Sequence, residues 1–214
     1  MRLKDQARHA LTRRGAAALG SWVGGANVRG EDALLDEVRT CYWHLGTQVA
    51  WPRRRALQLH LVFSALPGAA LFRALRDRGW GEDQAVAAVA EVINGRAVQQ
   101  RRRLELLARH RALRAAFLPA AQIVTRVGFP APGWETRWRE RSASAVAFDM
   151  TRCYLLDTFT QLGCPELTKA YCAGDDALYT DLCPQLRWQR TGTLAAGADA
   201  CDFRFERGER SGAR

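Results

Sequence analysis

The chain has 214 residues, of which 48% are hydrophobic and 25% are charged. This is the balance of an ordinary globular protein, so the composition argues against a disordered chain and allows one substantial domain. The net charge of +10 comes almost wholly from arginine. The clusters Arg53–Arg55 and Arg101–Arg103 lack the interleaved aromatic residues that stack on bases. We therefore expect solvated helix faces and no nucleic-acid partner.

The first 128 residues are predicted to be mainly helical. A helix over residues 31–50 carries apolar residues at three- and four-residue spacing. A second helix over residues 53–64 is expected to end before Pro67-Gly68, because proline and glycine interrupt helices. A third helix should follow over residues 69–78.

Signals for membrane insertion or export are weak. The longest apolar run, residues 57–75, contains polar residues and Pro67, so it is expected to be too short and too broken to span a membrane. Arg13-Arg14 and the apolar stretch after them fit a twin-arginine signal poorly. We expect a cytoplasmic protein without a membrane partner.

Helical periodicity returns over residues 81–118, and Asn94-Gly95 is expected to end or kink a helix there. The residues predicted to be buried in the second part are Val98, Leu104, Leu107, Leu113 and Phe117.

The pattern changes after the Pro/Gly cluster of residues 129–133. Alternating residues predict strands, and helical spacing predicts two helices between them. The strands are expected over residues 134–138, 145–151, 186–194 and 201–206, and the helices over residues 153–162 and 166–182. The fold class is therefore α+β: a mainly helical N-terminal half followed by a small antiparallel sheet of about four strands with two intervening helices. We expect a helical segment (1–128) and an α+β region (134–207) that together form one compact domain, followed by a tail (208–214).

Six cysteines are present, and no two have the C-x-x-C spacing of zinc ribbons or thioredoxin-like motifs. A chain of this size does not need disulfides for stability, so we expect free thiols in a reducing compartment. Cys41, Cys164 and Cys183 have no adjacent chemistry and are expected to be structural.

The other three cysteines lie where polar residues gather. Cys153 lies at a predicted strand-to-helix junction, where a helix N-terminus acidifies a thiol. Cys172 is followed at i+3 and i+4 by Asp175 and Asp176, which share its helix face. Cys201 begins the last predicted strand. A metal site formed by Cys172, Asp176 and Cys201 is geometrically possible, but we expect no metal and no cofactor.

A thiolate nucleophile needs a group that accepts and returns its proton. All four histidines lie in the helical half, so a carboxylate is the expected partner, either Asp176 or Asp202. Arg190, Arg204 or a helix terminus would activate the thiol. A buried cysteine can instead be a small core residue, and Cys201 shares its predicted strand face with two phenylalanines.

Several blocks of the C-terminal region occur in a distinctive order and spacing. They are Phe148-Asp149-Met150-Thr151-Arg152-Cys153, Gly163-Cys164-Pro165-Glu166-Leu167, Cys172 with Asp175-Asp176, and the stretch from Arg190-Thr191-Gly192 to Cys201-Asp202-Phe203-Arg204-Phe205. Over residues 145–207 this order resembles the L-2-amino-thiazoline-4-carboxylic acid hydrolase family. The helical N-terminal part fits the family's general layout only loosely.

The resemblance implies hydrolytic opening of a small sulfur- and nitrogen-containing ring, of the carboxylate-bearing thiazoline type, by a cysteine-dependent site. It also implies that the substrate can belong to specialised metabolism. The matching positions are Cys153, Cys172, Asp176, Arg190, Cys201 and Asp202. Arg190 or Arg204 would bind the substrate carboxylate, and Cys153 would line the substrate site.

In this hypothesis, Cys201 or Cys172 attacks the carbon between the ring nitrogen and sulfur. Asp176 or Asp202 protonates the departing ring atom, and water releases the covalent intermediate. Two other functions stay open: a non-catalytic domain of the same fold that binds or senses a small ligand, and an arginine-driven anion- or nucleic-acid-binding protein. The sequence does not determine the oligomeric state, the true substrate or the pathway.

Overall fold

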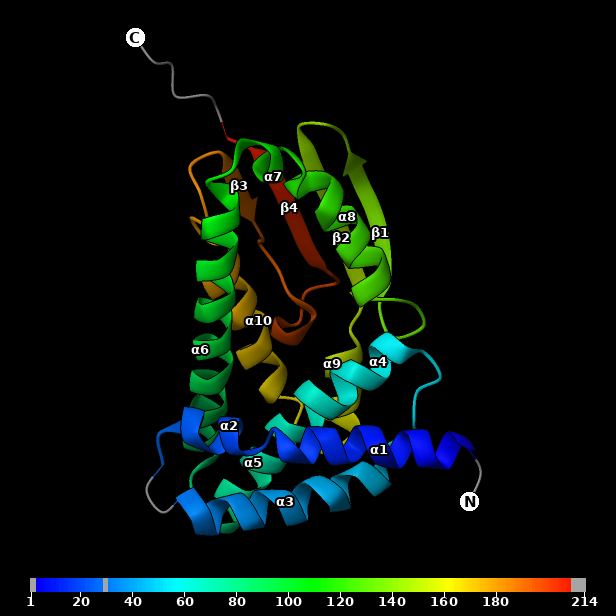
Figure 1. Cartoon of the computed structure of the whole chain (residues 1–214), viewed down its shortest axis with the longest axis vertical. Coiled ribbons are helices and arrows are strands. Elements are labelled where there is room, and N and C mark those ends of the chain that lie inside the picture. The colour runs from blue at the N-terminus through cyan, green and yellow to red at the C-terminus, as the bar shows by residue number, and fades with distance from the viewer. Residues whose placement is uncertain (1–2, 29–30, 209–214) are drawn as a thin grey trace. The chain divides into compact units, whose positions relative to one another are not determined.

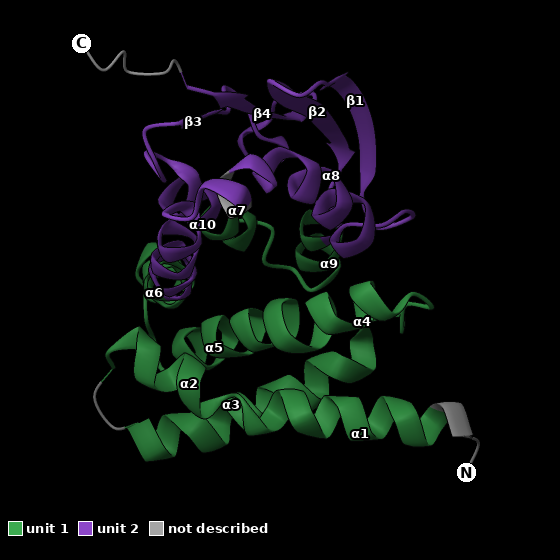
Figure 2. Cartoon of the chain, turned by 45° about the horizontal axis from the view of Figure 1, so that its top comes forward, with its two compact units in different colours: residues 1–95, 155–171 green, residues 96–154, 172–214 purple. Residues whose placement is uncertain are grey.

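The computed structural model describes residues 3–28 and 31–208 and confirms the predicted α+β class (Figure 1). Helices come first, and a four-stranded antiparallel sheet with intervening helices follows. The chain divides into two compact units, one formed by residues 1–95 with 155–171 and the other by residues 96–154 with 172–214 (Figure 2). The N-terminal helical segment and the C-terminal α+β region therefore each contribute to both units.

The first unit is helical. Its elements are α1 (Leu3–Ala17), α2 (Gly20–Val23), η1 (Gly24–Ala26), α3 (Glu31–Gln48), α4 (Arg55–His60), η2 (Leu61–Ala65), α5 (Leu66–Asp77), the first part of α6 (Glu82–Ala108), most of α9 (Tyr154–Gln161) and the start of α10 (Leu167–Tyr179). Helix α3 buries Leu34, Val38, Tyr42 and Leu45, the stripe that its spacing predicts.

The helices α4, η2 and α5 form one continuous run, so the predicted break before Pro67-Gly68 is wrong. The segment η2 is a π-helical turn, in which an N–H bonds to the carbonyl five residues earlier. Pro67 has no N–H, and the carbonyl five residues before it, that of Val62, instead accepts from the Tyr42 hydroxyl at 3.2 Å. The helix therefore continues through the proline without leaving that buried carbonyl unpaired.

The apolar run is consequently unbroken. The helix from residue 55 to residue 77 has 23 residues, and its most apolar 18-residue window has a mean hydropathy of 1.2, so by length and composition it could cross a membrane. However, 61% of its most apolar window is buried inside the protein, and a core helix of a soluble protein meets the same criterion.

Helix α6 also runs on where a break or kink at Asn94-Gly95 was expected. Val98 and Leu107 are exposed, which contradicts their predicted burial, whereas Leu104 and Phe117 are half-buried and the Leu113 side chain lies outside the described residues. The second part of α6 instead turns Ala97 and Arg101 inward. The Arg101 guanidinium donates to backbone carbonyls just after the end of α10, including that of Asp181 at 2.8 Å.

The second unit contains the sheet. Its strands are β1 (Glu135–Arg141), β2 (Ala145–Arg152), β3 (Leu186–Gln189) and β4 (Cys201–Arg207), in the order β1-β2-β4-β3, and its other helices are α7 (Arg111–Ala115) and α8 (Phe117–Gly128). The predicted hairpin of the first two strands is confirmed. Strand β3 is shorter than expected, because the chain leaves the sheet after Gln189 and forms a connection, residues 190–200, that includes the 3-10 turn η3 (Leu194–Ala196).

Side chains alternate across the sheet, which gives it two different faces. The register pairs Phe148 with Phe203 and Met150 with Cys201. We call this the apolar face, and the helices α8 and α10 cover it (Figure 1). The Phe205 ring lies 5.9 Å from Phe117 of α8 and 5.1 Å from Tyr179 of α10, measured between ring centroids.

The other face we call the polar face. Its side chains include Asp149, Asp202, Arg204, Glu206 and Glu140. Cys201 and Asp202, neighbours in sequence, therefore lie on opposite faces of the sheet.

Candidate active site

The structure gathers the three candidate thiols in the second unit. Cys153 directly precedes α9, Cys172 lies on α10 and Cys201 is the first residue of β4. Burial raises the pKa of Cys172 to about 12, and the charges of Cys201 and Cys153 add to this effect. Burial likewise raises the pKa of Cys201, again with a contribution from Cys153. Because such effects fall off with distance, the three thiols lie within electrostatic range of one another.

The Cys201 thiol accepts a hydrogen bond from the backbone of the connection that follows β3. Its side chain is buried, and the Leu194 N–H donates to Sγ at a distance of 3.3 Å. This hydrogen bond and the charge of Arg190 lower the pKa of the Cys201 thiol against the effect of burial. A thiolate at this position would therefore have a fixed donor to stabilise it.

The Arg190 side chain lies inside the second unit, with 4% of its surface exposed. Its Nη1 donates to Oδ2 of Asp175 at 3.1 Å, and its Nη2 donates to Oδ1 of Asp176 at 2.9 Å. Nη2 also donates to the backbone carbonyl of Cys172 at 2.8 Å. The guanidinium thus ties the connection after β3 to three residues of α10.

Aromatic rings complete the surroundings of this guanidinium. Its carbon lies 5.4 Å from the ring centroids of both Trp188 and Phe203, within the range of cation–π attraction. With so little exposed surface and its donors engaged, Arg190 would have to release an aspartate before it could bind a substrate carboxylate.

Asp175 has an unusual environment for a carboxyl group. Its side chain keeps 40% of its surface exposed, yet the surrounding protein desolvates it and raises its pKa to about 6. Arg190 opposes this shift and Asp176 adds to it. The charge of Asp175 in turn raises the pKa values of Cys172 and Cys201. A carboxyl that exchanges its proton near neutral pH therefore lies close to the thiols.

The sequence places both Asp175 and Asp176 on the helix face of Cys172, and it predicts Asp176 as the candidate acid. The i+3 and i+4 positions are equivalent by spacing alone. In the structure, the Asp176 side chain is 53% exposed and pairs with Arg190. The two carboxyls are distinguished by the desolvation of Asp175 by the surrounding protein. The spacing of residues along the sequence does not reveal this difference.

Asp202 lies on the polar face, and its carboxylate accepts hydrogen bonds from the connection after β3. Oδ1 accepts from the Gly192 N–H at 2.6 Å and the Thr191 N–H at 2.9 Å, and Oδ2 accepts from Thr191 Oγ1 at 2.6 Å. Burial opposes ionisation, but these hydrogen bonds outweigh it and lower the pKa of Asp202. The group stays a carboxylate at neutral pH, which suits an acceptor rather than a proton donor.

Arg204 also lies on the polar face. It forms an ion pair with Glu206 on its own strand and another with Glu140 of β1, where Nη2 and Oε2 are 3.1 Å apart. Its position separates it from the Cys201 thiol by the thickness of the sheet.

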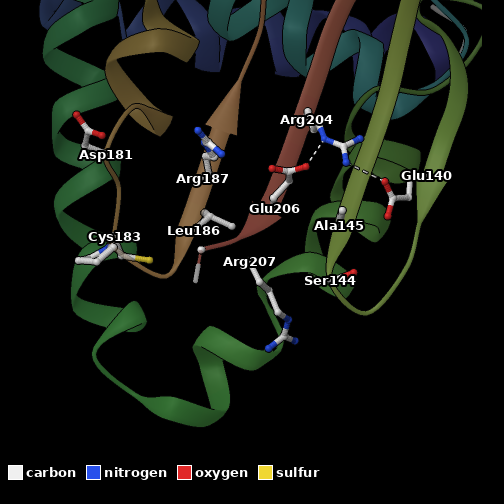
Figure 3. A pocket seen from close by; sticks show the side chains of 12 residues that line it. Glu140, Ser144, Ala145, Asp181, Cys183, Leu186, Arg187, Arg204, Glu206 and Arg207 are labelled. Carbon is white, nitrogen blue, oxygen red and sulfur yellow. Dashed lines mark hydrogen bonds and ion pairs between the residues drawn. The ribbon is translucent and has the colours of Figure 1, made fainter. Parts of the chain in front are cut away.

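A cavity of about 930 Å³ adjoins Arg204 (Figure 3). Its lining residues are Glu140, Ser144, Ala145, Asp181, Cys183, Pro184, Leu186, Arg187, Arg204, Glu206, Arg207 and Gly208. Three acids and three arginines line it, so their charges give it no strong preference for an anion or a cation. The cavity is lined by Arg204 and Cys183 but by none of the candidate thiols Cys153, Cys172 and Cys201, so its size does not make it the candidate active site.

All six cysteines are free. Within residues 3–28 and 31–208, no group of three or more His, Cys, Asp or Glu side chains is arranged to hold a metal ion, and this includes the possible set of Cys172, Asp176 and Cys201. Burial raises the pKa of Cys164 to about 12.

An α+β protein that gathers thiols, a carboxyl titrating near neutral pH and an anchored arginine has the groups needed for nucleophilic and acid–base chemistry. The chain belongs to the L-2-amino-thiazoline-4-carboxylic acid hydrolase family, because that family model matches residues 58–205, more than half of the chain. The match covers the ordered C-terminal blocks and extends upstream into the helical part. No curated protein and no solved structure matches the chain. The family is one of hydrolases that act on a small molecule, an aminothiazoline carboxylate.

Proposed function

We propose that this protein opens the ring of an aminothiazoline carboxylate, or of a related carboxylate-bearing thiazoline, through a cysteine thiolate. Family membership supports the reaction class. The observation that carries the cysteine step is the proximity of the Cys172 and Cys201 thiols to Asp175, whose pKa is raised to about 6 by burial. A nucleophile and a group that can move its proton are thereby available together.

Cys201 is the better nucleophile of the two candidates named from sequence. Its Sγ accepts the Leu194 N–H, which stabilises the thiolate. Within the described part of the chain the Cys172 thiol has no such hydrogen bond, and burial raises its pKa to about 12. Cys172, whose raised pKa keeps it a neutral thiol, then lines the site together with Cys153.

The proposed reaction has two steps. In the first, Asp175 takes the thiol proton of Cys201 while Sγ forms a bond to the carbon between the ring nitrogen and sulfur. The bond from that carbon to one ring heteroatom breaks, and Asp175 passes the proton to the departing atom. In the second, water attacks the same carbon and gives a proton to Asp175. The bond from Sγ to carbon breaks, and the proton returns to Cys201.

Arg190 has a different role in this proposal from the one inferred from sequence. Its contacts with Asp175 and Asp176 orient the two carboxylates rather than bind the substrate. Arg204 is on the other face of the sheet and does not contact a substrate held at Cys201.

The test is to trap the covalent intermediate. The purified protein is mixed with 2-amino-thiazoline-4-carboxylate, quenched in acid and analysed by intact-mass and peptide mass spectrometry. We expect an adduct on Cys201 and loss of the intact ring from solution. An adduct on Cys172 or Cys153 would assign the nucleophile to that residue, and wild-type turnover in each of Cys201→Ala, Cys172→Ala and Cys153→Ala would exclude a cysteine mechanism.

A further inference from the structure

The connection between β3 and β4, residues 190–200, is held at its start by Asp202. Three backbone and side-chain groups of Thr191 and Gly192 donate to this one carboxylate, at distances of 2.6 to 2.9 Å. A carboxylate that accepts several hydrogen bonds of this kind fixes the local backbone strongly. The connection is therefore pinned to the polar face of β4 within its first three residues.

The same connection meets the apolar face of β4 a few residues later. The Thr193 hydroxyl caps η3 by accepting the Ala196 N–H at 3.2 Å, and the next residue, Leu194, donates its N–H to Sγ of Cys201. Gly197, at φ +89°, ends this turn in a conformation that favours glycine. Asp202 and Cys201 therefore accept hydrogen bonds from one short segment, residues 191–194, on opposite faces of β4.

Arg190 stands immediately before the pinned residues. Only Thr191 separates it from Gly192, so the hydrogen bonds to Asp202 also fix the backbone from which the guanidinium extends to Asp175 and Cys172. A loose connection would release two things at once: the N–H on Cys201 and the arginine beside Asp175.

We infer that Asp202 is a positioning residue, which holds the β3–β4 connection so that the Leu194 N–H stays on Cys201 and Arg190 stays on Asp175. This inference rests on the proposed function for its consequence in turnover. Asp202 acts through the connection and touches neither the thiol nor the reacting carbon. Its cross-strand neighbour Asp149 is paired separately with Arg139, which donates from Nε at 2.6 Å, so the Asp202 carboxylate serves the connection.

The inference is tested with Asp202→Asn and a matched control, Glu206→Gln. Glu206 lies two residues further along β4, on the same face, and pairs with Arg204 rather than with the connection. The readout is the pH midpoint for alkylation of Cys201 by iodoacetamide, measured by peptide mass spectrometry. The midpoint reports the thiol pKa and is independent of any change in how fast the reagent reaches the sulfur.

For Asp202→Asn we expect the midpoint to rise by about half to one pH unit, because the hydrogen bond to Sγ is weakened. The kcat should fall about tenfold while KM changes less than about threefold. Removal of a nearby negative charge alone would lower the midpoint, so the sign separates positioning from simple electrostatics. Glu206→Gln should leave the midpoint and kcat unchanged.

Thr191→Val is the second variant. It keeps every charge and both backbone donors and removes only the Thr191 Oγ1 hydrogen bond. We therefore expect a smaller upward shift of the alkylation midpoint. This variant tests the inference if Asp202→Asn does not fold. An unchanged or lowered midpoint in a folded variant, or an equal rise in Glu206→Gln, overturns the inference. The alkylation readout needs no turnover, so an adduct on another cysteine would contradict the proposed nucleophile without affecting this test.

Discussion

The two faces of the sheet are built from the same strands but have opposite chemistry. On the apolar face, Cys201 and Phe203 lie under helices, beside a guanidinium with 4% of its surface exposed. On the polar face, Arg204 and Glu206 form partly exposed ion pairs around a large open cavity. The two faces differ in desolvation, which raises the pKa values of Cys172, Cys201 and Asp175 beside the apolar face. The proposed function therefore places the chemistry at these desolvated groups and not at the cavity.

The largest effect is expected on the apolar face from Cys201→Ser. Loss of the nucleophile should lower kcat by at least about 10³-fold without unfolding the protein. Cys183→Ser, which changes a thiol that lines the polar-face cavity, is the control and should retain turnover. Steady-state kinetics with circular dichroism measures both. Equal activity of the two variants would contradict the assignment of the nucleophile to Cys201 on the apolar face.

Asp175→Asn should have the next largest effect. The wild-type kcat/KM should rise with pH through about 6, the value to which burial raises the pKa of Asp175, because the carboxylate form accepts the thiol proton. The variant should lose this limb of the profile and about 10²-fold in rate. Asp176→Asn is the matched control, since it also pairs with Arg190. A limb near 6 that disappears in Asp176→Asn instead would transfer the role to that residue.

The two aspartates should also affect folding stability with opposite dependence on pH. The folded protein raises the pKa of Asp175 from 3.8 to about 6, so it binds more protons than the unfolded chain between these values. Wild type should therefore lose stability relative to Asp175→Asn as pH rises through this window.

Asp202 has a lowered pKa because of its hydrogen bonds to Thr191 and Gly192. Its contribution is present above the unfolded value of 3.8 and should be lost as pH falls below that value. Urea denaturation of wild type, Asp175→Asn and Asp202→Asn from about pH 3 to about pH 7 gives both slopes. The same sign of slope for both variants would contradict the assigned environments.

The smallest effect is expected from Arg204→Gln on the polar face. The side chain is 41% exposed and its ion pairs are open to solvent, so activity should stay within about twofold of wild type. Substrate kinetics at low and high salt measures this. A rise of KM by tenfold or more would mean that Arg204 binds the substrate, as the sequence suggested.

Much of the fold was predictable because local patterns specify it. The alternation of residues 145–151 and the helical spacing of residues 31–50 gave the hairpin and α3 nearly at their observed bounds. The break predicted at Pro67 is absent, because the Tyr42 hydroxyl, distant in sequence, donates a hydrogen bond to the Val62 carbonyl in place of the N–H that proline lacks. Local sequence rules do not predict a contact of this kind. Periodicity predicts a buried Leu107, whereas in the structure Leu107 is exposed and Arg101 of the same helix donates to the backbone carbonyl of Asp181.

The candidate site was predictable to the level of a residue set. Cys153, Cys172, Cys201 and Arg190 occur in blocks whose order resembles a hydrolase family, and the structure brings them together. The roles of the residues were not predictable. Asp175 and Asp176 are equivalent by spacing, and the sequence does not show that Asp202 accepts hydrogen bonds from Thr191 and Gly192.

By itself, the sequence determined the α+β class, the order of the strands along the chain and the family. It did so because periodicity and ordered motifs are local properties of a chain. The tertiary structure alone decided which carboxyl is enclosed, which thiol receives a backbone donor and which arginine is already paired. These depend on desolvation and on contacts between residues far apart in sequence, and both arise only when the elements pack.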